Sequence, residues 1–291
     1  MRAALCLALC ACASPRPAPA LGAPQTTPAG PRVSQACRPG TPPGQSFIIA
    51  SRVMGETRRI NVFTPPGYDE GSARYPVLYM PDGGMEEDFP HVADAVLAGI
   101  TWEKLQPLII VGIENTERRR DMTGPTSVAE DRKIAPRVGG SAAFRKFIRD
   151  ELMPEIRKRY RTTDETAIVG ESLAGLFVVE TFFLDPDMFD TYIAISPSVW
   201  WNGGSLIRGA GDWLRARPSL RKTLYLTSAD ESDIVSGLQQ LARTLEAGAP
   251  AGLVWFYHPM PDQFHDTIYR ASSPKAFRIV FARAAGTQPT P

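Results

Sequence analysis

The sequence predicts an α/β fold, with a mostly parallel central sheet, an N-terminal antiparallel hairpin and helices on both faces of the sheet. Three observations support this prediction. Short apolar runs alternate with helix-like segments after the first hairpin. Some runs, such as residues 107–113, are apolar at consecutive positions, which is typical of parallel strands covered on both faces. No linker interrupts the alternation, so we expect one folded domain.

The hairpin is expected first, with strands at residues 47–50 and 59–63 and a turn near Gly55. The polar stretch 114–140 lacks periodicity and is expected to be irregular. Each predicted helix lies where a parallel pair of strands needs a right-handed crossover. The remaining strands are expected at 77–80, 107–113, 166–169, 192–195, 223–227 and 253–257, and the helices at 89–97, 141–160, 173–183, 234–245 and 274–284.

The N-terminal segment predicts an exported protein. Arg2 supplies a positive charge, residues 3–13 are an unbroken stretch of Ala, Leu and Cys, and the prolines that follow prevent a helix from continuing. We therefore expect a signal peptide over residues 1–23, a disordered Pro/Ala-rich tether over 24–45 and a single folded domain over 46–286.

The sequence is compatible with two exported forms of the protein. Cleavage near Ala13 or Ala23 would release a periplasmic or secreted protein. Alternatively, residues 9–12 resemble a lipoprotein cleavage box, which would make Cys12 a lipid anchor. After Cys12 the chain has only Cys37, so no internal disulfide framework is expected.

The charge balance excludes several classes of protein. Lys and Arg number 32 against 31 Asp and Glu, so no basic surplus is present to neutralise phosphates and nucleic acid is not an expected partner. No apolar run is long enough to cross a bilayer as a mature helix. The hydrophobic content of 43% and the charged content of 22% are those of a globular domain.

Ser172 is the candidate nucleophile. It lies in Val-Gly-Glu-Ser-Leu-Ala-Gly at 169–175, between a predicted strand and a predicted helix. Such a turn holds a serine on a strained backbone above the sheet, and small residues two positions away, here Gly170 and Ala174, avoid a clash. The N–H of Leu173, at the helix start, would stabilise an oxyanion. An ordinary small-residue turn is the alternative.

A serine hydroxyl needs a base, and the chain has three histidines. His265 is the candidate because it lies in the loop beyond the last strand. In this fold the triad residues follow one another along the chain as nucleophile, acid and histidine, which places the base in that loop. An orienting carboxylate is expected after strand 223–227. Glu231 is favoured there, with Asp230 close behind, and Asp233 also qualifies. A solvated helix cap is the alternative for this acidic cluster.

The loop after strand 77–80 is expected to supply the second oxyanion donor. Gly84 follows Asp82 and Gly83, and its lack of a side chain allows a close approach of backbone to substrate. A simple turn is the alternative for these residues.

Four larger side chains are candidates for substrate contacts. Arg118 and Arg120 would face the substrate or, alternatively, form a surface salt-bridge cluster. Trp200 and Trp201 would form a wall of the pocket, or one of them would belong to the core.

Several segments resemble a known family when taken together. They are Glu-Thr-Arg-Arg-Ile-Asn-Val-Phe-Thr-Pro-Pro-Gly-Tyr at 56–68, Tyr-Pro-Val-Leu-Tyr-Met-Pro-Asp-Gly-Gly at 75–84, Val-Gly-Ile-Glu-Asn-Thr-Glu-Arg-Arg-Arg-Asp at 111–121, the segment 170–175, and Ser-Pro-Ser-Val-Trp-Trp-Asn at 196–202. The chain thereby resembles, from Ser46 to Ala284, the putative esterase family, which includes the ferri-enterobactin (siderophore) esterases and esterase D-like proteins.

The resemblance implies an α/β-hydrolase fold, hydrolysis of carboxylic esters and no metal or organic cofactor. Ser172 and His265 match the catalytic serine and histidine of the family. The position of the acid varies within the family, and some members manage with a serine–histidine pair, so Glu231 is not determined by the resemblance.

We therefore expect a serine carboxylic-ester hydrolase that forms an acyl-enzyme with a small-molecule ester, of siderophore type or another type. A carbohydrate-directed acetyl or feruloyl esterase is the alternative enzyme. A non-catalytic binding protein on the same fold is the alternative from another class, and the retained serine and histidine argue against it.

Overall fold

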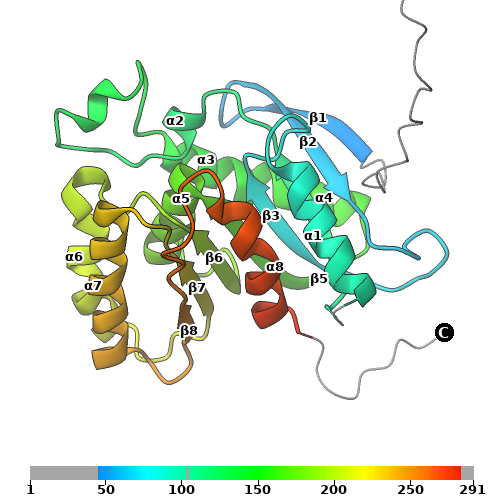
Figure 1. The fold of residues 1–291 in the computed structure, drawn as a ribbon. Helices are drawn as coiled ribbons and strands as arrows, with labels where there is room; N and C mark the ends of the chain where they lie inside the picture. The colour runs from blue at the N-terminus through cyan, green and yellow to red at the C-terminus, as the bar shows by residue number, and fades with distance from the viewer. Residues whose placement is uncertain (1–44, 103–104, 283–291) are drawn as a thin grey trace, which may run out of the picture. The chain divides into compact units, whose positions relative to one another are not determined.

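The computed structural model describes residues 45–102 and 105–282 and builds them around an eight-stranded sheet in the order β1-β2-β4-β3-β5-β6-β7-β8 (Figure 1). The predicted signal peptide, and the predicted tether except for Gln45, lie outside the described residues. Within the described ranges, no helix has the length and apolar character needed to span a membrane.

The predicted hairpin is present at one edge of the sheet. β1 (Gln45–Ser51) and β2 (Glu56–Phe63) are antiparallel, and β2 also pairs antiparallel with β4 (Ile109–Ile113). All other neighbours are parallel, so the prediction of a mostly parallel sheet is confirmed. The strands concerned are β4, β3 (Tyr75–Pro81), β5 (Thr162–Glu171), β6 (Thr191–Ile195), β7 (Thr223–Thr227) and β8 (Val254–Tyr257).

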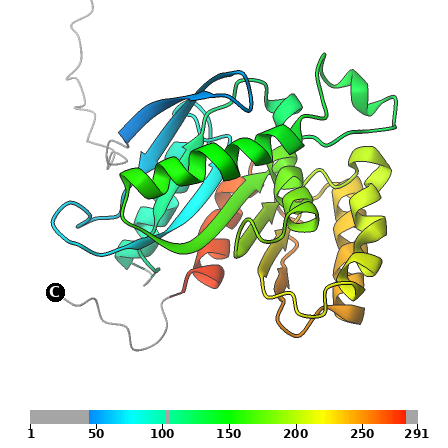
Figure 2. The same ribbon diagram turned by 180° about the vertical axis from the view of Figure 1, so that it is seen from behind.

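Helices cover both faces of the sheet (Figures 1 and 2). In β6, Tyr192 and Ala194 belong to one core and Ile193 and Ile195 to the other, because successive side chains of a strand point to opposite faces. One core is covered by α1 (Phe89–Trp102) and α8 (Ile268–Val280). The other is covered by α3 (Ser141–Phe147), α4 (Met153–Arg159), α5 (Ser172–Leu184), α6 (Trp201–Arg215) and α7 (Ser232–Gly248).

Helix α5 is the best-buried helix near the candidate nucleophile. Every residue from Leu173 to Phe183 is buried, which explains why the segment is apolar on all sides rather than on one stripe. Because the whole helix is packed into the core, its first residue, Ser172, is held in a fixed place at the carboxyl edge of β5.

Helix α6 was not predicted from the sequence. Residues 202–204 at its start have φ values of +51°, +63° and +74°, so the chain first makes a left-handed turn. The two glycines of this turn, Gly203 and Gly204, mask the start of the helix in the sequence pattern.

Other element boundaries also differ from the predictions. α8 begins at Ile268 and contains Pro274, where the sequence predicted its start; a proline removes one helical hydrogen bond without necessarily ending the helix. The single helix predicted over 141–160 is divided by a π-helical turn at Ile148–Leu152. The stretch predicted to be irregular contains two short helical turns, α2 (Arg118–Asp121) and Asp131–Lys133.

Candidate active site

Ser172 occupies a sharp bend between β5 and α5. Its φ is +59°, a left-handed value that few residues other than glycine adopt. A Cβ on Gly170 would lie 2.6 Å from the carbonyl carbon of Ala174, and one on Gly175 would lie 3.0 Å from the carbonyl oxygen of Ile195. The bend therefore requires small residues at these positions, and the predicted strand, turn and helix around Ser172 are present.

The structure brings Ser172 together with two side chains from distant loops. Ser172 Oγ lies 3.0 Å from Nε2 of His265, which is located between β8 and α8. Nδ1 of His265 lies 2.7 Å from Oε1 of Glu231, the residue directly before α7. An imidazole with one nitrogen at a carboxylate and the other at a hydroxyl is oriented to accept the hydroxyl proton.

The alternative acids and bases lie elsewhere or have other contacts. Asp230 and Asp233 are exposed, and the carboxylate that lies at Nδ1 of His265 is that of Glu231. The two remaining histidines have other partners: His91 is buried beside Asp88 and Tyr269, and the Nδ1 atom of His258 lies 3.3 Å from the hydroxyl of Tyr225.

Glu171, which was not predicted as a site residue, also faces the imidazole of His265. Its Oε1 lies 3.3 Å from Nε2, the nitrogen that faces Ser172, and this buried oxygen has no hydrogen-bond partner among the described residues. Burial raises the pKa of Glu171 to about 8, although Arg118 opposes the rise; three carboxylates add to it, those of Asp82, Asp88 and Glu231. At neutral pH the Glu171 carboxyl is therefore mostly protonated.

The free energy of unfolding should depend on the charge of Glu171. The pKa is about 8 in the folded chain and near the ordinary glutamate value of 4.5 when the chain unfolds, so this group stabilises the fold below about pH 4.5 and its contribution is lost as the pH rises toward 8. Because glutamine cannot ionise, we expect Glu171→Gln to raise the Tm above that of the wild type by about 10 °C at about pH 9, and to leave it unchanged at about pH 4.

Thermal unfolding of the full chain across this pH range measures the effect. Glu165→Gln is the matched control, because Glu165 is an exposed glutamate on the same strand, and it should show no pH-dependent difference from the wild type. Equal Tm values for Glu171→Gln and the wild type at the alkaline end would contradict the raised pKa of Glu171.

Asp82 organises the loop after β3. It has a φ of +54°, and its carboxylate accepts two hydrogen bonds from Arg118, at 2.7 Å from Nε and 2.9 Å from Nη2. Asn115 Nδ2 donates a further hydrogen bond to the same carboxylate. Paired hydrogen bonds from an arginine fix a carboxylate in orientation as well as in place. The guanidinium of Arg118 therefore holds the loop that carries Gly84.

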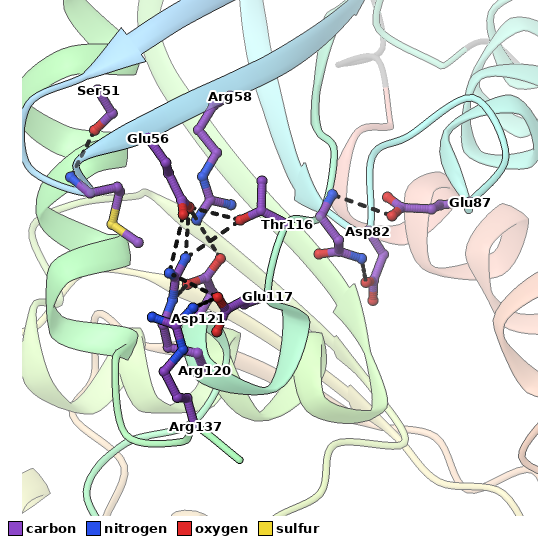
Figure 3. A network of polar contacts seen from close by, with 12 residues as sticks. Ser51, Glu56, Arg58, Asp82, Glu87, Thr116, Glu117, Arg120, Asp121 and Arg137 are labelled. Atoms are coloured by element: carbon purple, nitrogen blue, oxygen red, sulfur yellow. Dashed lines mark hydrogen bonds and ion pairs between the residues drawn. The ribbon is translucent and has the colours of Figure 1, made fainter. Parts of the chain in front are cut away.

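The backbone N–H of Gly84 already has an acceptor in this structure. It donates to Oε2 of Glu87 at 2.7 Å, and the other Glu87 oxygen accepts from the backbone N–H of Asn115 at 3.3 Å. Burial raises the pKa of Glu87, whose side chain lies near Asp82 (Figure 3). The Gly84 N–H thus becomes available to an oxyanion only when Glu87 turns away. Leu173, by contrast, lies in the first turn of α5, where N–H groups have no intrahelical partner.

Arg120 belongs to a network of ion pairs between β2 and α2 (Figure 3). Its Nη1 and Nη2 lie 3.2 Å and 2.7 Å from the oxygens of Glu56, and its Nε lies 2.6 Å from Asp121. The hydrogen bond from Arg120 lowers the pKa of Glu56 to about 2. Arg58, whose side chain is fully buried, contacts the same two carboxylates. In this structure, therefore, the guanidinium of Arg120 forms salt bridges with Glu56 and Asp121.

A cavity of about 580 Å³ opens beside α2. Arg118 forms part of its wall and also bonds to Asp82, so the cavity adjoins the loop after β3. Four arginines and one glutamate belong to this wall, and three of the arginines already form ion pairs: Arg118 with Asp82, Arg120 with Glu56 and Asp121, and Arg137 with Glu117. The lining residues are Glu117, Arg118, Arg119, Arg120, Ala135, Pro136 and Arg137.

The two predicted tryptophans have different environments. Trp201 is only 4% exposed, and its Nε1 donates to the carbonyl of Gly124 at 2.9 Å, so it belongs to the core. Trp200 is 37% exposed and packs against Trp201 with ring centroids 6.1 Å apart. Only Trp200 therefore offers a substantial surface to a ligand. Within residues 45–102 and 105–282, no group of three or more His, Cys, Asp or Glu is arranged to hold a metal ion.

Sequence comparisons identify relatives of known activity. Ferri-bacillibactin esterase BesA of Bacillus subtilis (strain 168) is 33% identical over 185 residues, which are 56% of this chain and 60% of that protein. The siderophore triacetylfusarinine C esterase of Aspergillus fumigatus is 29% identical over 182 residues, which are 58% of this chain and 60% of that protein. The chain thus spans less than two thirds of the length of these curated relatives.

A structural comparison and a family model agree with these relatives. An IroE-like serine hydrolase from Shewanella oneidensis superposes with a TM-score of 0.73 and 27% identity, covering 82% of this chain and 80% of that chain. The family model described as "Putative esterase" matches residues 51–260, which is more than half of the chain. This chain therefore has an α/β-hydrolase fold and belongs to the Putative esterase family.

Proposed function

We propose that this protein is a serine carboxylic-ester hydrolase that forms an acyl-enzyme on Ser172. The observation that carries the proposal is the distance of 3.0 Å between Ser172 Oγ and His265 Nε2, with Glu231 2.7 Å from the second imidazole nitrogen. Family membership supports ester hydrolysis as the reaction. Two relatives named as esterases, one of ferri-bacillibactin and one of triacetylfusarinine C, support it further.

The reaction begins when Ser172 Oγ attacks the carbonyl carbon of the ester while its proton passes to Nε2 of His265. Glu231 stabilises the imidazolium that forms. The backbone N–H of Leu173 donates to the developing oxyanion, and the N–H of Gly84 becomes the second donor once Glu87 has turned away. The tetrahedral intermediate then collapses, and the leaving alcohol takes the proton from the imidazolium.

Deacylation repeats these steps with water as the nucleophile. His265 accepts a proton from the water as its oxygen attacks the acyl carbon. Collapse of the second tetrahedral intermediate releases the carboxylic acid and returns the proton to Ser172 Oγ.

The proposed substrate is a small-molecule ester of siderophore type. The names of the two relatives, an esterase of ferri-bacillibactin and one of triacetylfusarinine C, support a substrate of this type. Export is proposed with it, through the signal peptide at residues 1–23, to the periplasm or the medium, either as a released protein or as a lipoprotein anchored at Cys12.

Hydrolysis of an ester panel by the purified protein tests the proposal. The panel contains p-nitrophenyl acetate, longer acyl esters, acetylated and feruloylated sugars, and a cyclic trilactone. We expect hydrolysis of p-nitrophenyl acetate and a preference for the trilactone. A preference for the sugar esters would instead favour the carbohydrate-directed alternative, and the absence of turnover with every ester would contradict the hydrolase function.

A further inference from the structure

Ser196 bonds to the carboxylate of Glu231 from the side opposite His265. Its side chain is fully buried at the carboxyl end of β6, and its hydroxyl donates to Oε2 of Glu231 at 2.7 Å. The same hydroxyl oxygen accepts the backbone N–H of Ala229 at 3.2 Å. Because both the donor and an acceptor site of the hydroxyl are used, its orientation is determined, and it ties the carboxylate to the backbone two residues before it.

The backbone of Ser196 is strained. Its φ is +38°, and it precedes Pro197, although a residue before proline ordinarily adopts an extended conformation. The backbone N–H of Ser196 donates to the carbonyl of Thr227 at the end of β7, at 2.9 Å, which connects the ends of two neighbouring strands. Glycine would adopt this φ without strain but would lack the hydroxyl. The strained backbone conformation is therefore found at a residue whose hydroxyl, among the described residues, bonds to Glu231 and Ala229.

The carboxylate of Glu231 needs a second contact to keep its orientation. A glutamate has several freely rotating bonds, and ordering such a side chain costs conformational entropy. Glu231 is 26% exposed, so water competes for its oxygens. With Oε1 at His265 and Oε2 at Ser196, both ends of the carboxylate are bonded and its plane is determined.

We propose that Ser196 is a positioning residue for ester hydrolysis, which keeps the Glu231 carboxylate, and through it the His265 imidazole, in the orientation required by Ser172. This inference rests on the proposed function, because it assigns to Ser196 a role in the same reaction. Ser196 itself touches neither the substrate nor the reacting atoms, so its effect reaches the reaction only through Glu231.

A double-mutant cycle in the full chain tests this inference. We expect Ser196→Gly to lower kcat for p-nitrophenyl acetate about tenfold and to leave KM within about twofold, because orientation of the base matters in the transition state rather than for substrate binding. In a Glu231→Ala background the same change should alter kcat by less than about twofold, since the group that Ser196 positions is already absent.

Two further variants separate positioning from folding. Ser196→Ala also lacks the hydroxyl but keeps the Cβ, so it should reproduce the loss in kcat if Ser196→Gly fails to fold. Ser228→Ala is the matched control, because Ser228 is equally buried and its hydroxyl contacts Tyr257 rather than Glu231. We expect its kcat to stay within about twofold of the wild type.

Two results would overturn the inference: an unchanged kcat in both Ser196 variants, or a loss in the Glu231→Ala background as large as in the wild type, which would mark Ser196 as merely structural. Failure of the proposed function has a different signature, because Ser172→Ala would then retain full activity whatever the Ser196 variants do.

Discussion

The Ser172→Ala variant is expected to lose ester hydrolysis, with kcat/KM for p-nitrophenyl acetate reduced about 10⁴-fold or more. The reason is chemical, because the variant lacks the oxygen that attacks the ester carbonyl and no other hydroxyl is described at His265 Nε2. Its fold should be unchanged, since the Cβ at this strained bend is retained. Steady-state kinetics and circular dichroism of the purified variant measure the two expectations.

Two variants control this experiment. Ser236→Ala removes an exposed hydroxyl on α7 and should leave kcat/KM unchanged. The double variant Ser172→Ala/His265→Ala should be no less active than Ser172→Ala alone, because residues that act as one catalytic unit have non-additive effects. Wild-type turnover in Ser172→Ala would contradict the assignment of the nucleophile.

The second large effect is expected at Glu231. Glutamine can turn its NH₂ group toward Nδ1 of His265, which then becomes an acceptor and leaves the imidazole proton on Nε2. An imidazole protonated at Nε2 cannot accept the proton of Ser172, so we expect Glu231→Gln to lower kcat about 10³-fold with little change in KM. The pH dependence and steady-state kinetics of the variant measure this loss.

Asp230→Asn is the matched control for Glu231→Gln. Asp230 precedes Glu231 in the same loop and has the same charge, but its side chain is exposed, so the control should keep kcat within about twofold of the wild type. If Asp230→Asn caused the larger loss, the acid of the triad would be Asp230. If neither variant lost activity, the enzyme would work with Ser172 and His265 alone.

Much of the fold could be predicted from the sequence because buried strands and amphipathic helices have strong local patterns. The strand predicted at 223–227 coincides with β7, and the run at 107–113 contains β4. The prediction failed where special backbone geometry interrupts a pattern. In α6 the left-handed turn at 202–204 conceals the start of the helix. In α8 the sequence suggested that Pro274 was the first helical residue, although the helix begins at Ile268.

The residues of the candidate site could likewise be predicted only in part. Ser172 and His265 could be proposed because a bend motif and the order of the chain locate them. Glu171 and Ser196 could not, because their importance depends on which side chains converge at the ends of neighbouring strands. Nothing local distinguishes Ser196 from other serines before a proline, and only the pairing of β6 with β7 brings it to Glu231.

Labelling of the full chain with a fluorophosphonate probe, followed by peptide mass spectrometry, tests whether His265 activates Ser172 as the nucleophile. The probe bonds to a serine oxygen only where a neighbouring base activates it. We expect one adduct, located on Ser172, absent from Ser172→Ala and formed far more slowly in His265→Ala. A wild-type protein that hydrolyses esters while carrying no adduct, or carrying it on another residue, would contradict the role of Ser172 as the nucleophile.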